Sequence, residues 1–210
     1  MIVDIIFLSN TVDVEQYGNT QRAINTLLLA DSSDTEYNII IVESNKDHLD
    51  QGFHYHGCNV VIPDEEFNYN RFLNKGLEHT KGGWVIISNN DVIFTQHWLW
   101  RILEFNHHNP GYHSFSPYEP KWHKDKAEQS GIYGDLPFYE GYRTSFEITG
   151  WCIVMKPELI KTCELFDERF KFWYQDNDYA KTIESKGFKH ALVTDSRVYH
   201  MVSKSYSTIP

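Results

Sequence analysis

The chain has 210 residues, a formal net charge of −10 at pH 7 and an aromatic content of 15%, from 13 Phe, 13 Tyr and 6 Trp. This length suits one large domain or two small ones and can bury a sizeable core. The 41% hydrophobic content excludes a disordered chain, and the apolar runs are strand-sized, too short to cross a bilayer. No Lys/Arg run supplies the clustered cations that neutralise nucleic-acid phosphates, so direct nucleic-acid binding is disfavoured.

The cysteines indicate the redox compartment. Cys58, Cys152 and Cys163 are widely spaced and odd in number, and they form no CxxC pair. The first residues also lack the basic flank and small-residue cleavage site of a signal peptide. We therefore expect a protein of the reducing cytoplasm.

The first part of the chain alternates apolar runs with helical patterns. Strands are predicted at 3–8, 39–42 and 84–87, and helices at 20–30, 70–78 and 96–105. Asn19 or Thr20 is the expected cap of the first helix. The alternation predicts an α/β domain with a largely parallel sheet.

The middle and end of the chain follow different patterns. Residues 107–147 are rich in His, Pro, Gly and Tyr and have no sustained period, which predicts an irregular, functional or mobile loop. Beyond it, a strand interrupted by Gly150 is expected, and then short elements. These are helices at 157–163 and 179–185 and strands at 191–193 and 197–199.

Three of the predicted strands end in polar residues. These are 9–11, 43–45 and 89–91. In open α/β sheets, ligands collect outside the carboxyl ends of parallel strands, so the three segments predict one polar pocket. Taken singly, each segment is better explained as an ordinary turn.

Asp91 is a candidate ligand for a hard divalent cation, because it directly follows a buried strand. The alternative is a carboxylate that caps the next turn. The surrounding residues 1–100 carry 5 Lys or Arg against 14 Asp or Glu. A region this acidic can bind an anion if a metal ion lies between its carboxylates and the anion.

A second group of carboxylates precedes the predicted helix at 179–185. Asp176 or Asp178 can cap that helix, or Asp176 can serve as a general base that removes a proton from a hydroxyl. His200 follows a short apolar strand, and no HxxxH pair or Cys/His spacing indicates a zinc site.

In this order and spacing, the motifs resemble the inverting GT-A glycosyltransferases of family 2, especially the bacterial rhamnosyltransferase-like branch. Nearly the whole chain outside 107–147 takes part. The matching segments and family patterns are 39–45 with V-D-N-x-S, 74–77 with R-N-x-G-L, 86–92 with L-N-N-D-V followed by W-L at 98–99, 149–170 with the G-x-x-x-x and F-D-E-R-F segment, 174–178 with Y-E-D-V-D, and 198–200 with V-x-H.

The resemblance implies a Rossmann-like GT-A fold with a mixed, mostly parallel sheet and helices on both faces. It implies a single domain over 1–210, with a nucleotide-sugar-binding half at 1–106, the aromatic-rich loop at 107–147, and an acceptor and catalytic half at 148–210. The residues expected to contact the nucleotide-diphosphate sugar are Ser9, Asn10, Glu43, Asn74, Asn89 and Asn90.

The implied chemistry is metal-dependent transfer of a sugar to a hydroxyl. Asp91, with His200, would hold Mg²⁺ or Mn²⁺ at the donor diphosphate, and Asp176 would deprotonate the acceptor. The acceptor pocket would be formed by Trp151, Trp173, Asp178 and Tyr142. The aromatic rings of 107–147 would stack on sugar, or would form a satellite core.

Some positions depart from the family pattern and keep alternatives open. Glu43 replaces Asp, Gln175 replaces an acidic residue, and Asp91 is the single carboxylate of the metal motif. One alternative is a catalytically weakened fold that binds nucleotide-sugar or glycan. Another keeps the enzyme but takes the hydroxyl of a modified DNA base as acceptor, against which the negative charge argues. A dinucleotide-dependent oxidoreductase is excluded, because no GxGxxG follows the first strand.

Overall fold

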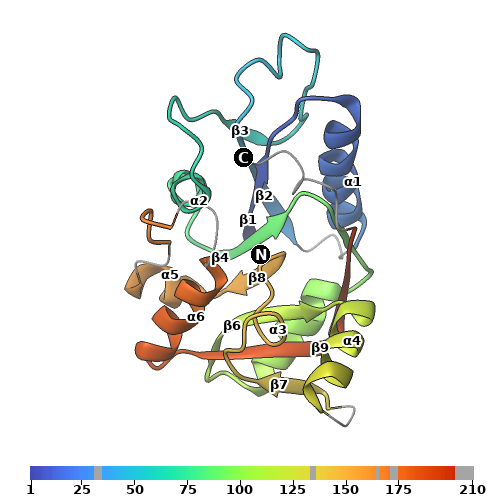
Figure 1. The fold of residues 1–210 in the computed structure, drawn as a ribbon, viewed down its shortest axis with the longest axis vertical. Helices are drawn as coiled ribbons and strands as arrows, with labels where there is room; N and C mark the ends of the chain where they lie inside the picture. Colours follow the sequence, from blue (N-terminus) through green and yellow to red (C-terminus); the bar gives the residue numbers. More distant parts are fainter. Residues whose placement is uncertain (31–34, 133–135, 164–165, 171–174, 202–210) are drawn as a thin grey trace.

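The computed structural model describes residues 1–30, 35–132, 136–163, 166–170 and 175–201. Within them, nine strands form one mixed sheet in the order β3-β2-β1-β4-β8-β6-β9-β5, with β7 also paired to β9. Figure 1 shows helices on both sides of this sheet.

The first half of the sheet is parallel. Its elements are β1 (Ile2–Ser9), α1 (Val14–Ala30), β2 (Glu36–Glu43), β3 (Asn59–Val61), α2 (Tyr69–Leu77) and β4 (Trp84–Asn89). The register pairs Ser9 with Glu43 and Leu8 with Asn89, so these strands end together at one edge of the sheet. This edge is where the sequence predicts a polar pocket.

The second half mixes directions. Its elements are β5 (Val92–Phe94), α3 (Trp98–His108), β6 (Tyr112–Tyr118), α4 (Pro120–Ser130), β7 (Phe138–Glu140), β8 (Cys152–Met155), α5 (Pro157–Thr162), α6 (Gln175–Ser185) and β9 (Lys189–His200). Strand β8 runs antiparallel between β4 and β6, while β9 runs parallel to β6 and antiparallel to β5 and β7. The end of β9 therefore returns to the edge where β4 ends.

Alternation along the strands creates a core on each face. Ile5 and Phe7 of β1 pack in one buried cluster with residues of α1 and α3. Ile6, between them, belongs to the opposite cluster, which contains residues of α2, α5 and α6. In α2, a Cβ at Gly76 would lie 2.6 Å from Ile6 Cγ2, so glycine permits the close approach of this helix to the sheet. The predicted α/β class with helices on both faces is confirmed.

The prediction of an irregular loop over 107–147 is wrong for most of its length, because the segment contains β6, α4 and β7. Ser114 and Ser116 are buried in β6 and hide its apolar pattern. Along α4, His123 is the buried residue, so an apolar period is missing. Two aromatic residues of this segment, Tyr112 and Phe115, are buried in the main hydrophobic core and not in a separate satellite core.

Three boundaries also differ from the prediction. Helix α1 begins at Val14, because Asp13 Oδ1 accepts the N–H of Gln16 at 2.8 Å and caps the first turn in place of Asn19 or Thr20. Helix α6 begins at Gln175, which puts the two candidate carboxylates inside its first turn rather than before it. The two short strands predicted near the end are one strand, β9, which continues through the polar residues 194–196.

Within the part of the chain that the structure describes, the helices are all too short or too polar to cross a membrane.

Candidate active site at the carboxyl edge of the sheet

Glu43, at the end of β2, holds the loop that follows β1. Its side chain is fully buried and accepts hydrogen bonds from the N–H of Thr11 (3.0 Å), Thr11 Oγ1 (2.7 Å) and the N–H of Asn45 (2.8 Å). A buried carboxylate is stable only when it is bonded in this way. The contacts therefore give Glu43 the task of shaping the strand-end loop, while its prediction as a nucleotide-sugar contact stays a prediction.

A group of hydroxyls surrounds Ser9 beside this carboxylate. Ser9 Oγ lies 2.9 Å from Thr11 Oγ1, 3.3 Å from Tyr55 Oη and 3.4 Å from Thr20 Oγ1. Burial raises the pKa of Tyr55, which keeps it a neutral hydroxyl. Asn10, next to Ser9, is exposed. Tyr55 and Thr20 were not predicted as site residues, since both come from segments without a motif.

The metal motif lies between β4 and β5. Pairing of Val92 with His200 brings the end of β9 alongside the motif. His200 Nε2 lies 3.1 Å from a carboxylate oxygen of Asp91, which is buried, and 3.4 Å from Asn89 Nδ2. The structure thus brings together Asp91 and His200, although they are far apart in sequence.

Asn90 connects this motif to the hydroxyl group around Ser9. Its Nδ2 donates to Thr20 Oγ1 at 2.9 Å, and Thr20 in turn contacts Ser9. Four of the predicted donor contacts, Ser9, Glu43, Asn89 and Asn90, therefore belong to one edge of the sheet, linked through buried polar side chains.

The donor atoms at Asp91 and His200 fit a divalent cation. A carboxylate oxygen and an imidazole nitrogen face each other there, and Mg²⁺ and Mn²⁺ accept such ligands alongside phosphate and water oxygens. The described residues contain no cluster of three or more His, Cys, Asp or Glu side chains suited to a metal. A diphosphate would therefore have to complete the coordination.

Asp176 lies in the first turn of α6, against the backbone of Gly150. A Cβ added to Gly150 would lie 2.4 Å from Asp176 Oδ1, so glycine is required for this approach. Burial raises the pKa of Asp176 to about 6, an effect only partly offset by the hydrogen bond that the carboxylate accepts from the N–H of Gly150. A carboxylate with such a pKa is suited to take up a proton near neutral pH.

Trp151, the next residue, links this carboxylate to the metal motif. Its carbonyl oxygen accepts the N–H of Asn89 at 2.8 Å, and its ring stacks on His200 with centroids 5.2 Å apart and planes at 22°. The indole Nε1 is buried, and none of the described residues offers it a hydrogen bond. The segment 150–151 therefore joins the candidate base to the candidate metal site.

The remaining predicted residues have other contacts. Asn74 Nδ2 donates to the carbonyl of Phe166 (3.0 Å) and to Glu168 Oε1 (3.1 Å). Tyr142 donates its hydroxyl to the carbonyl of Phe188 at 2.9 Å. These contacts are structural, so the donor role of Asn74 and the acceptor role of Tyr142 stay predictions.

Two acceptor residues remain. Asp178 accepts a hydrogen bond from the N–H of Asp167, and burial is the main cause that raises its pKa. Trp173 lies outside the described residues.

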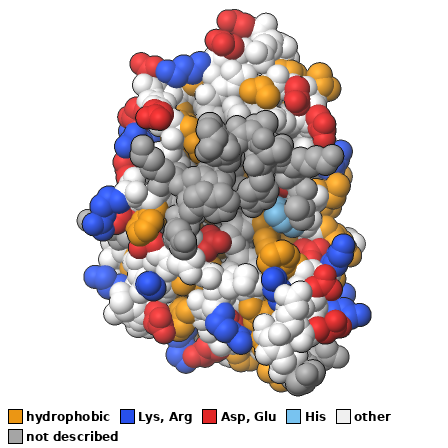
Figure 2. Space-filling model, in the orientation of Figure 1, with side chains coloured by type: hydrophobic (Ala, Val, Ile, Leu, Met, Phe, Trp, Pro, Cys, Tyr) orange, Lys and Arg blue, Asp and Glu red, His pale blue; other side chains and the backbone are white. Residues whose placement is uncertain are grey.

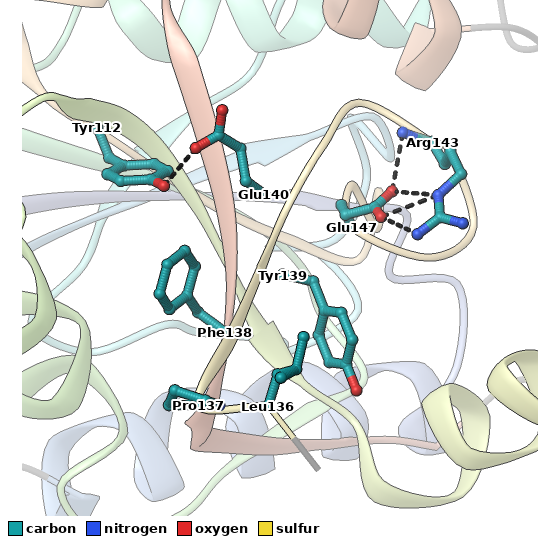
Figure 3. Close-up of a pocket in the computed structure, with 8 residues that line it drawn as sticks. All are labelled: Tyr112, Leu136, Pro137, Phe138, Tyr139, Glu140, Arg143 and Glu147. Carbon is teal, nitrogen blue, oxygen red and sulfur yellow. Dashed lines mark hydrogen bonds and ion pairs between the residues drawn. The ribbon is translucent and has the colours of Figure 1, made fainter. Parts of the chain in front are cut away.

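A cavity of about 480 Å³ lies apart from this edge (Figure 3). Its lining includes Tyr112, at the start of β6, which pairs with Lys189 at the start of β9. His200 is at the other end of β9. The polar groups of the cavity bond to one another, Tyr112 with Glu140 and Arg143 with Glu147. We therefore assign the candidate site to the strand ends and not to this cavity.

The visible surface agrees with the charge balance of the sequence. On the face shown in Figure 2, Lys and Arg side chains are scattered among Asp and Glu side chains. Scattered cations of this kind do not supply the dense positive field that a nucleic-acid backbone needs.

Comparison with known proteins bears on both the family and the fold. Residues 15–163 match the family described as glycosyl transferase family 2. The chain is also similar to the solved structure of the mannosyltransferase PcManGT from Pyrobaculum calidifontis in complex with GDP-Man and Mn²⁺, with a TM-score of 0.70 and 15% sequence identity. That similarity covers 97% of this chain and 57% of the mannosyltransferase, so this chain spans little more than half of that neighbour. A search of curated proteins found no match. The fold is a GT-A fold.

Proposed function

Because the chain belongs to glycosyl transferase family 2, we propose that it transfers a sugar from a nucleotide-diphosphate donor to an acceptor hydroxyl, with inversion at the anomeric carbon. We place it in the rhamnosyltransferase-like branch on the motifs of its sequence. The free thiols of its cysteines support the cytoplasm as its compartment.

The single observation that carries the proposal is the segment 150–151. Gly150 contacts the carboxylate of Asp176, and Trp151 stacks on His200, which in turn contacts Asp91. A base and a cation site must lie on either side of the reacting carbon for a direct displacement. This segment supports such an arrangement, because it contacts both.

The donor would lie along the strand ends. Asn10 is exposed beside the hydroxyls of Ser9, Thr11 and Tyr55, and would contact the nucleoside. Asn89 and Asn90 precede Asp91 and would lie at the diphosphate. Asp91 and His200 would hold Mg²⁺ or Mn²⁺, which when bound offsets the charge of the departing diphosphate.

Asp176 would act on the acceptor as the general base. Its ionised carboxylate takes the proton of the acceptor hydroxyl while that oxygen forms a bond to the anomeric carbon. The bond from the anomeric carbon to the diphosphate breaks, and its electron pair stays on the diphosphate. Attack and departure on opposite faces invert the configuration. Trp151, whose ring stacks on His200, would contact the acceptor through the exposed part of that ring.

A ligand screen followed by turnover tests this function. GDP-mannose, UDP-glucose, UDP-N-acetylglucosamine and dTDP-rhamnose are each added with Mn²⁺, and a specific donor raises the melting temperature by mass action. Donor hydrolysis is then measured with and without Mn²⁺ for wild type, Asp176→Asn and the control Asp125→Asn, an exposed carboxylate of α4. We expect hydrolysis in wild type and the control alone. Donor binding without turnover in wild type would indicate a binding module, and the absence of any binding would contradict the proposal.

A further inference from the structure

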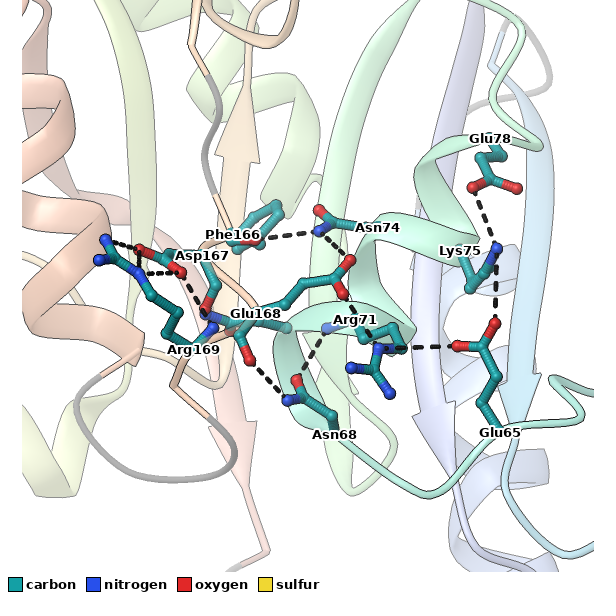
Figure 4. A network of polar contacts seen from close by, with 11 residues as sticks. Glu65, Asn68, Arg71, Asn74, Lys75, Glu78, Phe166, Asp167, Glu168 and Arg169 are labelled. Carbon is teal, nitrogen blue, oxygen red and sulfur yellow. Dashed lines mark hydrogen bonds and ion pairs between the residues drawn. The ribbon is translucent and has the colours of Figure 1, made fainter.

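Three asparagine side chains at α2 bind three successive backbone carbonyls of a distant segment. Figure 4 shows two of them, Asn68 and Asn74, facing that segment. Asn74 Nδ2 donates to Phe166 O at 3.0 Å, Asn70 Nδ2 to Asp167 O at 2.8 Å, and Asn68 Nδ2 to Glu168 O at 2.8 Å. We call this set of contacts the asparagine clamp. Each backbone carbonyl of residues 166–168 therefore accepts a hydrogen bond from an asparagine of α2 or of its N-cap.

Helix geometry explains why one helix can do this. Asn70 and Asn74 are four residues apart and therefore lie on the same face of α2. Asn68 is the N-cap residue, and its Oδ1 also accepts the N–H of Arg71. Asn68 and Asn70 are buried, with 4% and 1% exposure. Loss of either bond would leave a buried amide unpaired, so these bonds hold the segment firmly.

The side chain of Glu168 adds a charged contact to the clamp. Asn74 and Arg71 both donate hydrogen bonds to the Glu168 carboxylate, at 3.1 Å and 3.0 Å. These two bonds lower the pKa of Glu168, and the bond from Asn74 has the larger effect. Glu168 therefore stays ionised and bonded at neutral pH.

The opposite side of the clamped segment contacts the first turn of α6. The N–H of Asp167 donates to the carboxylate of Asp178, and the ring of Phe166 stacks on Tyr179 with centroids 6.3 Å apart and planes at 8°. Asp178 and Tyr179 follow Asp176 in the same turn and a half of helix. The segment thus lies between α2 and the helix that carries the candidate base.

The two helices belong to different halves of the molecule. Helix α2 packs against β1 through Gly76, whereas α6 follows the segment after β8. The asparagine clamp is therefore a direct link between the half with the strand-end pocket and the turn that carries Asp176.

We propose that Asn70 and Asn74 are positioning residues, which fix the first turn of α6, and with it Asp176, relative to the donor. The inference rests on the proposed function for the reaction, but the position of Asp176 is measurable without turnover. A change far from the chemistry that moves a reacting group by about 1 Å costs roughly 100-fold in rate. Since α6 is also held by the bond of Tyr179 Oη to Ser114 Oγ, at 2.7 Å, we expect a smaller loss.

The test compares Asn74→Asp, which keeps the shape but removes both donated bonds, with Glu78→Gln at the exposed end of the same helix. In Asn74→Asp, we expect kcat for donor hydrolysis to fall about 10-fold to 100-fold, while the donor KM and the calorimetric affinity for GDP or UDP with Mn²⁺ change less than about twofold. The ¹³C-detected titration midpoint of the Asp176 carboxyl group should shift by more than about half a unit. Glu78→Gln should match wild type in all of these.

Each other outcome is decisive. An unchanged kcat and Asp176 titration in folded Asn74→Asp would overturn the positioning role, and so would a raised KM with unchanged kcat, which would assign the clamp to donor binding. If Asn74→Asp does not fold, Arg71→Gln is tested in its place. It removes the partly exposed ion pairs of Arg71 with Glu168 and with Glu65, and should show the same split at about 2-fold to 5-fold. Absence of that split would overturn the proposal. If wild type hydrolyses no donor, the proposed function fails, while the Asp176 titration still tests the clamp.

Discussion

Replacing Asp176 with Asn removes a charge at a position where the fold opposes ionisation. Burial raises the pKa of this carboxyl group from 3.8 to about 6. Because the folded pKa is the higher one, the contribution of Asp176 to stability is complete below pH 3.8 and is lost as the pH rises through about 6. Asn keeps the size of the side chain and still offers an oxygen to the N–H of Gly150. Asp176→Asn should therefore not lose free energy of unfolding at this position as the pH rises.

The shift sets the size of the effect. About two pKa units at 1.36 kcal/mol each give an upper limit of about 3 kcal/mol at pH values above 7. Roughly half of this, about 1–1.5 kcal/mol, develops between pH 5 and pH 8. Relative to wild type, Asp176→Asn should gain that much free energy of unfolding between these two pH values.

Urea unfolding at pH 5 and pH 8 measures this difference for wild type, Asp176→Asn and the control Asp125→Asn. We expect a pH-dependent gain in the free energy of unfolding for Asp176→Asn and none for the control. A difference between Asp176→Asn and wild type that is the same at both pH values would refute the raised pKa of Asp176. Catalytically, wild-type kcat should decline as the pH falls below about 6, since the base is then protonated.

Further changes probe the neighbours of this carboxylate. Gly150→Ala places a Cβ 2.4 Å from Asp176 Oδ1, so kcat should fall with little change in donor KM, and urea unfolding should show a loss of about 1–3 kcal/mol; equal kcat would contradict the contact. Asp91→Asn should lower the rate of donor hydrolysis at least ~100-fold and raise the Mn²⁺ concentration needed for half-maximal rate. This is measured by adding Mn²⁺ back to enzyme that a chelator has stripped of metal, and an unchanged Mn²⁺ dependence would show that Asp91 is not a metal ligand. Thr20→Val leaves Asn90 without its 2.9 Å acceptor and should cost about 1–3 kcal/mol of stability in urea, together with a raised donor KM; a neutral result in both would show that this link is dispensable.

The fold could be predicted from the sequence wherever apolar periodicity is strong. The runs at 39–42 and 84–87 lie in β2 and β4, and the helical pattern at 70–78 lies in α2. Apolar periodicity does not predict the elements where polar side chains are buried in a strand or where most of a helix is exposed to solvent. Buried Ser114 and Ser116 in β6, and the polar surface of α4, concealed regular elements in the segment expected to be irregular.

The site was predictable to the extent that motifs name chemistry-bearing residues. Strand ends brought Ser9, Glu43 and Asp91 to one edge, as parallel pairing requires. What sequence did not show is how the side chains are used. The bonds of Glu43 to Thr11, and those of Asn74 to the segment 166–168, depend on tertiary contacts between residues more than 30 positions apart.

The configuration of the first product tests the central claim most directly. With Mn²⁺ and the nucleotide-diphospho-sugar selected by the ligand screen, whose anomeric linkage is known, the enzyme hydrolyses the donor, and ¹H NMR records the anomer released before mutarotation. In-line attack opposite the departing diphosphate, with Asp176 as base, predicts that wild type first releases the anomer opposite to the donor linkage, which is the β-anomer from an α-linked donor and the α-anomer from a β-linked donor such as dTDP-rhamnose, and that Asp176→Asn releases none. Initial release of the anomer with the same configuration as the donor, or equal release by Asp176→Asn, would contradict the account.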